Sequence, residues 1–163
     1  MTDDEKAQKA LRLLPKGSDL TLIILKGHLM LEEQLNAFLA SFPIHPKALP
    51  DARLTFHQKL RVIRAFSFAP SEKSWRLAEE LNRLRNKIAH HPEVLDLEAQ
   101  VKTFVALLPD ASGCRPSAIL PLHERLKFAV TFTAGAFSDM EAMNKTVFEA
   151  NRGLTQTVEQ KKE

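Results

Sequence analysis

Residues 20–41, LTLIILKGHLMLEEQLNAFLAS, carry the pattern that decides the fold. Apolar residues recur there every three or four positions, which is the spacing of one face of an α-helix. The residues on that face are Ile24, Leu31, Leu35, Phe38 and Leu39. Ser18 or Asp19 can cap the first turn, because short polar side chains accept hydrogen bonds from the free amides at a helix start. The stretch therefore predicts one long amphipathic helix.

The same helical spacing continues on both sides of this stretch, and no alternating pattern typical of strands competes with it. It predicts further helices over 4–14, 52–66, 71–91 and 93–108, and a long last helix that starts near Leu122. Prolines and short polar segments separate these helices. The sequence therefore predicts an all-α helical bundle.

Three segments are expected along the chain. Residues 1–18 form an N-terminal extension with a short helix, and residues 19–150 form the helical domain. Residues 151–163 form a polar C-terminal tail that we expect to fray.

The composition narrows the functional classes. The 163 residues carry a formal net charge of +3, which is compatible with a polyanionic partner but does not require one. Cys114 is the only cysteine, so one chain can form neither an internal disulfide nor a cysteine metal site. The six histidines lack the spacing of a helical zinc motif, and we expect neither a metal nor a cofactor.

The location of the protein follows from two absences in the sequence. The acidic start, residues 1–5, does not resemble a signal peptide. No apolar run approaches the roughly 20 residues that a membrane helix needs. We therefore expect a cytoplasmic protein without a membrane partner.

Two polar residues interrupt the apolar face of the 20–41 helix. His28 and Glu32 are one turn apart and fall inside that face or at its edge. A buried carboxylate is costly unless it is paired, so Glu32 requires a partner. One interpretation is that both residues pair with a cation from a neighbouring helix. The other is that they line a polar pocket or an interface.

The helix expected over 71–91 also carries polar residues beside its apolar stripe. Arg85 lies at the border of that stripe, and His90 and His91 close the helix just before Pro92. A helix C-terminus favours a protonated imidazole, so at least one of the two histidines is expected to titrate near neutral pH. The alternative is purely structural: the arginine forms a salt bridge, and the histidines satisfy the last carbonyls of the helix.

Residues 81–91, LNRLRNKIAHH, resemble the signature of the HEPN superfamily. Its nuclease members carry an arginine, a polar residue and, after a short spacer, a histidine. Arg85 and Asn86 match the first two positions, and His90 follows Arg85 after four intervening residues. His91 also fits the permitted spacing, so either histidine is a candidate.

A second stretch supports the resemblance, which covers roughly residues 20–150. Residues 27–35, GHLMLEEQL, are similar to the first core helix of several HEPN subfamilies. The resemblance implies an antiparallel bundle of four or five helices that pairs as a homodimer, with both copies of the motif in one cleft. It also implies metal-independent endoribonuclease chemistry, in which the ribose 2′-hydroxyl attacks the adjacent phosphate. Such a protein would be the toxin of a toxin–antitoxin pair, with an antitoxin protein as its partner, or a component of antiviral defence.

The resemblance assigns a role to each residue of the motif. His90 would be the acid–base group on the RNA substrate. Arg85 would hold the scissile phosphate and offset its growing charge, a task suited to a planar fork of donors. Asn86 would orient one of those donors or contact the RNA.

Other residues are candidates for supporting roles in the same site. His91, Glu32 and His28 are candidate supporting residues of the catalytic group. Lys87 and Arg83 would add positive potential along an RNA-binding cleft, or they would belong to a solvated helix face.

Helix geometry constrains the proposed pair. Five residues along a regular helix rotate His90 by about 140° from Arg85, so the two cannot easily grip one phosphate. Either the helix distorts before Pro92, or the working pair comes from two subunits.

One alternative function remains open from the sequence. Some HEPN families have lost the nuclease residues and act as binding or regulatory modules, either partner-binding or similar to transcriptional regulators. Some helical bacterial regulators of sugar metabolism resemble these families. Some HEPN toxins also carry a tyrosine just beyond the histidine, whereas this chain has no tyrosine. A DNA-binding repressor is a weaker idea, because the sequence offers no convincing helix-turn-helix signature.

Overall fold

The computed structural model describes residues 11–41, 49–67, 72–90, 96–110 and 115–160, with side chains described as far as residue 147. The regular elements in these ranges are all helical, which confirms the predicted all-α fold. In chain order they are α2 (Leu20–Ala40), the short 3-10 helix η2 (Pro50–Ala52), α3 (Phe56–Phe66), α4 (Glu72–His90), α5 (Leu97–Ala106) and α6 (Leu122–Gln160).

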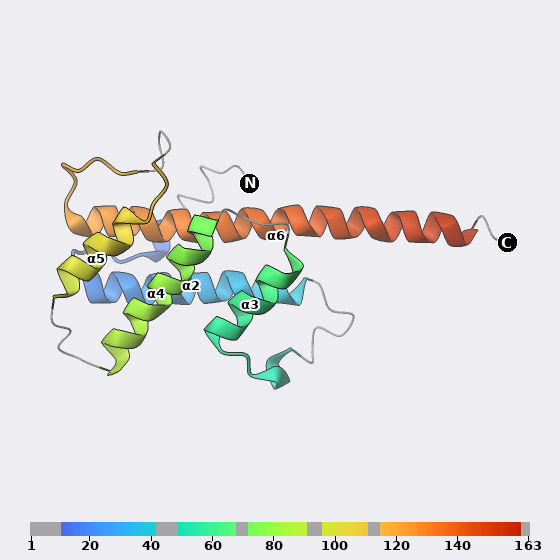
Figure 1. Cartoon of the computed structure of the whole chain (residues 1–163), viewed down its shortest axis with the longest axis horizontal. Helices are drawn as coiled ribbons and strands as arrows, with labels where there is room; N and C mark the ends of the chain where they lie inside the picture. Colours follow the sequence, from blue (N-terminus) through green and yellow to red (C-terminus); the bar gives the residue numbers. More distant parts are fainter. Residues whose placement is uncertain (1–10, 42–48, 68–71, 91–95, 111–114, 161–163) are drawn as a thin grey trace.

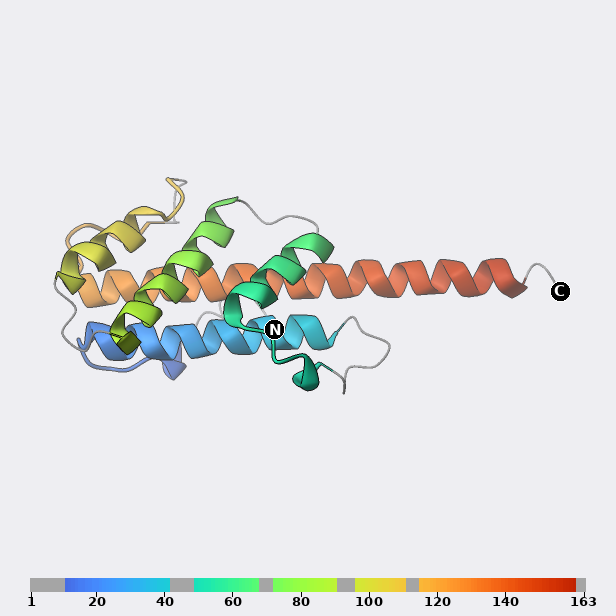
Figure 2. The same cartoon turned by 60° about the horizontal axis from the view of Figure 1, so that its bottom comes forward.

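Helices α2 and α6 lie side by side and run in the same direction (Figure 1, Figure 2). The antiparallel packing expected from the sequence is therefore not seen in this central pair. Helix α4 packs obliquely across both of them (Figure 1), α3 packs on α2, and α5 packs on α6. The shorter helices α3 to α5 lie between α2 and α6 in the sequence, and the chain returns along them to the end where α2 began. Helix α6 then starts beside the start of α2.

Apolar side chains from helices α2, α3, α4, α5 and α6 form one core. The largest side chains that are fully buried include Phe38, Leu31, Ile63, Leu81, Phe104 and Phe137. The ring of Trp75, on α4, packs edge-on against Phe137 of α6 with ring centroids 5.0 Å apart. The apolar faces predicted for α2 and α4 therefore meet α6 in the interior.

Gly27 permits the close approach of α2 to α6. A Cβ atom at this position would lie only 2.6 Å from Cγ1 of Val130 and 3.0 Å from Cγ2. Gly27 and Val130 are both buried. The absence of a side chain at residue 27 therefore sets the spacing of the two central helices.

Two helix starts are fixed by local capping. The carboxylate of Asp19 accepts a hydrogen bond from the Leu22 amide at 3.0 Å, so Asp19 rather than Ser18 caps α2. Helix α3 starts at Phe56, later than the predicted residue 52, because Thr55 and Gln58 form a reciprocal capping box.

The neighbouring segments differ from the predicted bounds for related reasons. Pro50–Ala52 form a 3-10 turn, and the left-handed backbone of Arg53 (φ 46°) separates it from α3. Asp96 is also left-handed (φ 64°) and precedes α5, which begins at Leu97. The predicted start of α5 at residue 93 lies outside the described residues.

The ends of other predicted helices are described only in part. Residues 4–10 of the predicted first helix, Ser71 and His91 lie outside the described ranges. Helix α6 continues through Gln160 and extends beyond the bundle, so residues 151–160 are helical where fraying was expected (Figure 1). In the described ranges, no helix combines the length and the hydropathy that a membrane span requires.

Candidate functional site

His28 lies in the buried contact between α2, α3 and α4. Its side chain is 5% exposed, and its ring stacks at a tilt on Phe56 of α3 with centroids 4.5 Å apart. Nε2 of His28 lies 3.1 Å from Oδ1 of Asn82 on α4. Because an amide oxygen only accepts hydrogen bonds, Nε2 carries the hydrogen in this arrangement. His28 is therefore paired with a neutral amide and not with the cation that one interpretation of the sequence expected.

The environment of His28 favours the neutral imidazole. Burial is the largest influence and lowers the pKa of His28 below its ordinary value of 6.5. The hydrogen bond to Asn82 and the negative charge of Glu32 raise that pKa in part, whereas the positive charges of Arg85 and Lys59 lower it. His28 thus lies within the electrostatic reach of Arg85.

Glu32 has the cationic partner that the sequence required. Its Oε1 lies 2.7 Å from Nζ of Lys59, which α3 supplies. The Lys59 side chain is 13% exposed and the Glu32 side chain 33% exposed, so the pair is shielded mainly on the lysine side. The prediction of a cation from a neighbouring helix is confirmed for Glu32.

Arg85 is partly buried beside this group, on α4. Its Nη1 donates a hydrogen bond to Oδ1 of the adjacent Asn86 at 3.1 Å. No carboxylate among the described residues lies within ion-pair distance of Arg85. The guanidinium of Arg85 is therefore oriented by the neutral amide of Asn86, and its positive charge stays available to an anion.

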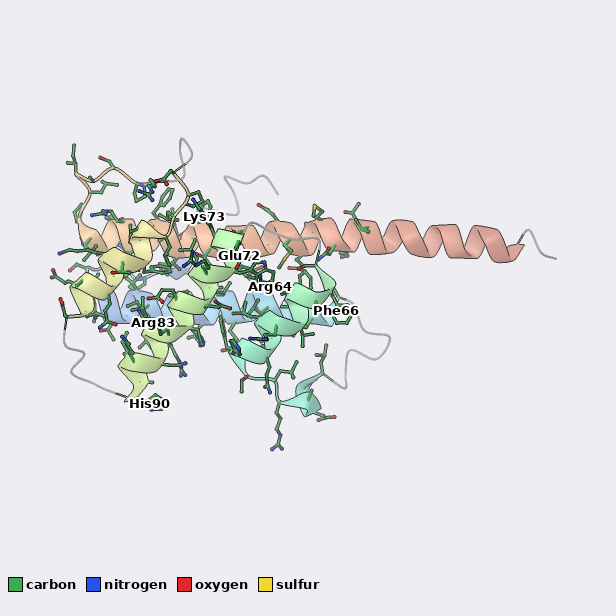
Figure 3. All side chains as sticks on the ribbon, in the orientation of Figure 1. Arg64, Phe66, Glu72, Lys73, Arg83 and His90 are labelled. Carbon is green, nitrogen blue, oxygen red and sulfur yellow. The ribbon has the colours of Figure 1, made fainter. Side chains whose placement is uncertain are left out.

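His90 is the last residue of α4 and is exposed at the end of that helix (Figure 3). Helix α4 is α-helical through this residue. It therefore lacks the distortion that would bring Arg85 and His90 to one phosphate within a single chain. The helical geometry separates Arg85 from His90 by about 140° around the axis and about 7.5 Å along it. Within one chain, the two residues therefore lie on different faces of α4.

The two candidate RNA-binding cations differ in how they are held. Nε and Nη2 of Arg83 both donate hydrogen bonds to the carboxylate of Glu80, with Nε 2.7 Å from Oε2, and this hydrogen bonding raises the pKa of Arg83. Nζ of Lys87 donates to Oε1 of Gln100 on α5 at 2.9 Å. Arg83 is therefore neutralised within its own helix, whereas Lys87 contacts a neutral amide and has no ion-pair partner among the described residues.

Sequence reasoning did not select Asn82, Lys59 or Phe56, which complete the group around His28. Asn82 has a usable signal, since it lies one turn before Asn86 on the same helix and interrupts apolar neighbours. Lys59 and Phe56 have no such signal, because their role depends on where α3 packs.

The described residues hold no group of three or more His, Cys, Asp or Glu side chains that is suited to a metal ion. Comparison with protein-family models finds no match, and comparisons with curated proteins and with solved structures find none either.

Proposed function

We propose that the protein is a metal-independent endoribonuclease of the HEPN type that works as a homodimer. The observation that carries the proposal is Arg85: a partly buried guanidinium, oriented by Asn86, with no carboxylate partner in the described structure, on the helix that ends at exposed His90. A cation kept free of carboxylates is suited to an anionic substrate group. The spacing of Arg85, Asn86 and His90 in the sequence supplies the link to RNA cleavage.

The proposed chemistry uses only side chains of the protein and the RNA itself. His90 accepts the proton of the ribose 2′-hydroxyl, and the 2′-oxygen forms a bond to the adjacent phosphorus. The bond from phosphorus to the 5′-oxygen breaks, and that oxygen takes the proton back from the His90 imidazolium. The products are a cyclic phosphate and a 5′-hydroxyl. Arg85 binds the phosphate oxygens whose negative charge grows during the attack.

The dimer is part of the proposal because one chain does not bring the two groups together. With a two-fold axis near α4, Arg85 of one copy and His90 of the other can face the same phosphate. Each dimer then has two equivalent sites. His28 and Glu32 support the helix that carries Arg85: the neutral His28 fills the contact between α2 and α4, and the negative charge of Glu32 balances the positive charge of Lys59.

The test is cleavage of RNA by the purified protein in EDTA. We expect cleavage without added metal and its loss in Arg85→Ala and His90→Ala. Arg12→Ala and His57→Ala are matched controls, because they remove the same side-chain types from exposed positions outside the candidate site, and they should retain activity. Cleavage that requires metal, or that survives both substitutions at the motif, would overturn the proposal.

A non-catalytic binding module is the second candidate, and the separation of Arg85 from His90 within one chain favours it if the protein is monomeric. A monomer in solution that binds RNA or a protein partner without cutting RNA would establish this alternative. A toxin or defence role is a further part of the proposal. It predicts growth arrest on expression of the wild-type chain but not of His90→Ala.

A further inference from the structure

We infer that a cationic cleft at the other end of α4 binds a backbone phosphate of the RNA several nucleotides from the cleavage site. The cleft lies between the first turns of α4 and the end of α5, and its volume is about 150 Å³. The charged side chains that line it are Lys73, Arg76, Asp110 and Arg115. This inference rests on the proposed function for the identity of the ligand as RNA.

Arg115 forms a fixed wall of the cleft. Its guanidinium donates hydrogen bonds to the carbonyl of Ala106 at 3.1 Å and to that of Leu108 at 3.1 and 3.2 Å. These carbonyls lie at the C-terminal end of α5, where a cation is favourable. Nη2 of Arg115 also lies 2.8 Å from Oδ1 of Asp110, a carboxylate that is 76% exposed. One arginine charge is thus anchored and balanced.

Lys73 and Arg76 supply the excess positive charge. Both are exposed, and neither has an ion-pair partner among the described residues. The nearby Glu72 pairs with Arg64 at 2.7 Å. Lys73 lies in the first turn of α4, where the helix dipole is positive and a cation is unfavourable. Three cations and one carboxylate line the cleft, and two of the cations lie near the N-terminus of α4. The result is a positive potential that a bound anionic group would offset.

The position on α4 connects the cleft to the proposed cleavage site. Lys73 and His90 lie at opposite ends of α4 (Figure 3). Arg76 and His90 lie on the same exposed face, since they differ by about 40° around the axis and by about 21 Å along it. A single RNA strand that follows this face would have its scissile bond near His90 and a more distant phosphate in the cleft.

The experiment measures RNA binding in the His90→Ala background, which prevents loss of the RNA by cleavage. Labelled single-stranded oligonucleotides of increasing length and a dinucleotide are titrated at several salt concentrations. For the long oligonucleotides, we expect Lys73→Gln/Arg76→Gln to weaken binding roughly tenfold and to lower the slope of log Kd against log salt by about 0.7 per lost phosphate contact. Dinucleotide binding should not change.

Lys26→Gln/Lys145→Gln is the matched control, because it removes two exposed cations from α2 and α6. Equal weakening in both double variants, or an equal effect on the dinucleotide, would overturn the cleft. The proposed nuclease is tested separately by cleavage with the native His90. If RNA is bound through Lys73 and Arg76 but is never cut, the proposed nuclease is wrong and the phosphate-binding cleft stands. If RNA is cut but its binding does not depend on these two residues, the cleft is wrong and the nuclease stands.

Discussion

Nε2 of His28 lies 3.1 Å from Oδ1 of Asn82, and this hydrogen bond joins the middle of α2 to the middle of α4 inside the bundle. It is a contact between two neutral groups in a place where a charge is disfavoured, because burial lowers the pKa of His28. Arg85 lies one turn after Asn82 on α4, so the same contact supports the helix that presents the proposed phosphate-binding residue.

The first prediction concerns the dependence of stability on pH. At pH values just below the ordinary histidine pKa of 6.5, His28 stays neutral in the folded state, whereas it binds a proton in the unfolded state. Stability should therefore fall as the pH drops below about 6.5, until the lowered pKa of the folded state is reached. His28→Gln keeps a donor for Asn82 and removes the titration. Chemical denaturation at pH 7.5 and 5.5 should show a smaller loss for the variant than for the wild type. An unchanged loss would show that other groups cause it.

The second prediction compares two helical glycines. Gly27→Ala should lower the free energy of unfolding by about 1–2 kcal/mol, because overpacking against Val130 outweighs the helix propensity of alanine. Gly135→Ala is the matched control: a Cβ there meets no atom within 4 Å, so the propensity gain of about 0.5–1 kcal/mol should remain. Thermal or denaturant unfolding measures both. Shifts of the same sign in the two variants would contradict the close approach of α2 to α6.

The helices were predictable from the sequence because their apolar spacing is a local property. Residues 20–41 predicted α2 almost to the residue, since the apolar face lies within the stretch and the Asp19 cap directly precedes it. The predicted start of α3 was wrong, because apolar spacing alone does not reveal the capping box that Thr55 forms with Gln58. The relative direction of α2 and α6 depends on the path of the intervening chain, and no local pattern encodes it.

In the candidate site too, local features were predictable from the sequence, whereas features that depend on packing were not. The angle between Arg85 and His90 followed from helix geometry alone, and the requirement of Glu32 for a cation followed from the cost of a buried carboxylate. The identity of that cation, Lys59, required the packing of α3 on α2. The same is true of Asn82 as the partner of His28, because these residues are 54 positions apart in the chain.

The third prediction concerns the pair Glu32 and Lys59. Glu32→Gln leaves the more buried member, Lys59, without a counter-charge, so it should cost about 1–3 kcal/mol of unfolding free energy. Lys59→Met should cost less, because the remaining Glu32 is one-third exposed and can be hydrated. The double variant should resemble Lys59→Met. Denaturant unfolding of the three variants measures this order, and an equal cost for both single variants would argue against the unequal burial of the pair.

The fourth prediction tests whether the proposed site is shared between two copies. Arg85→Ala and His90→Ala should each lower cleavage by about 10²- to 10⁴-fold on their own. In a mixed dimer of the two variants, one site has lost both groups and the other retains both, because Arg85 of one copy works with His90 of the other.

A 1:1 mixture, unfolded together and refolded to allow exchange, should therefore recover roughly one quarter of the wild-type activity, since half of the dimers are mixed and each has one intact site of two. Activity that appears on mixing cannot come from a site within one chain, where a mixed dimer holds no complete pair. Failure to recover activity, with mixed dimers demonstrated by differential tagging, would mean that Arg85 and His90 act within the same copy or not as a pair. Because α4 is regular from Glu72 to His90, a site within one copy would then require the helix to distort when RNA binds.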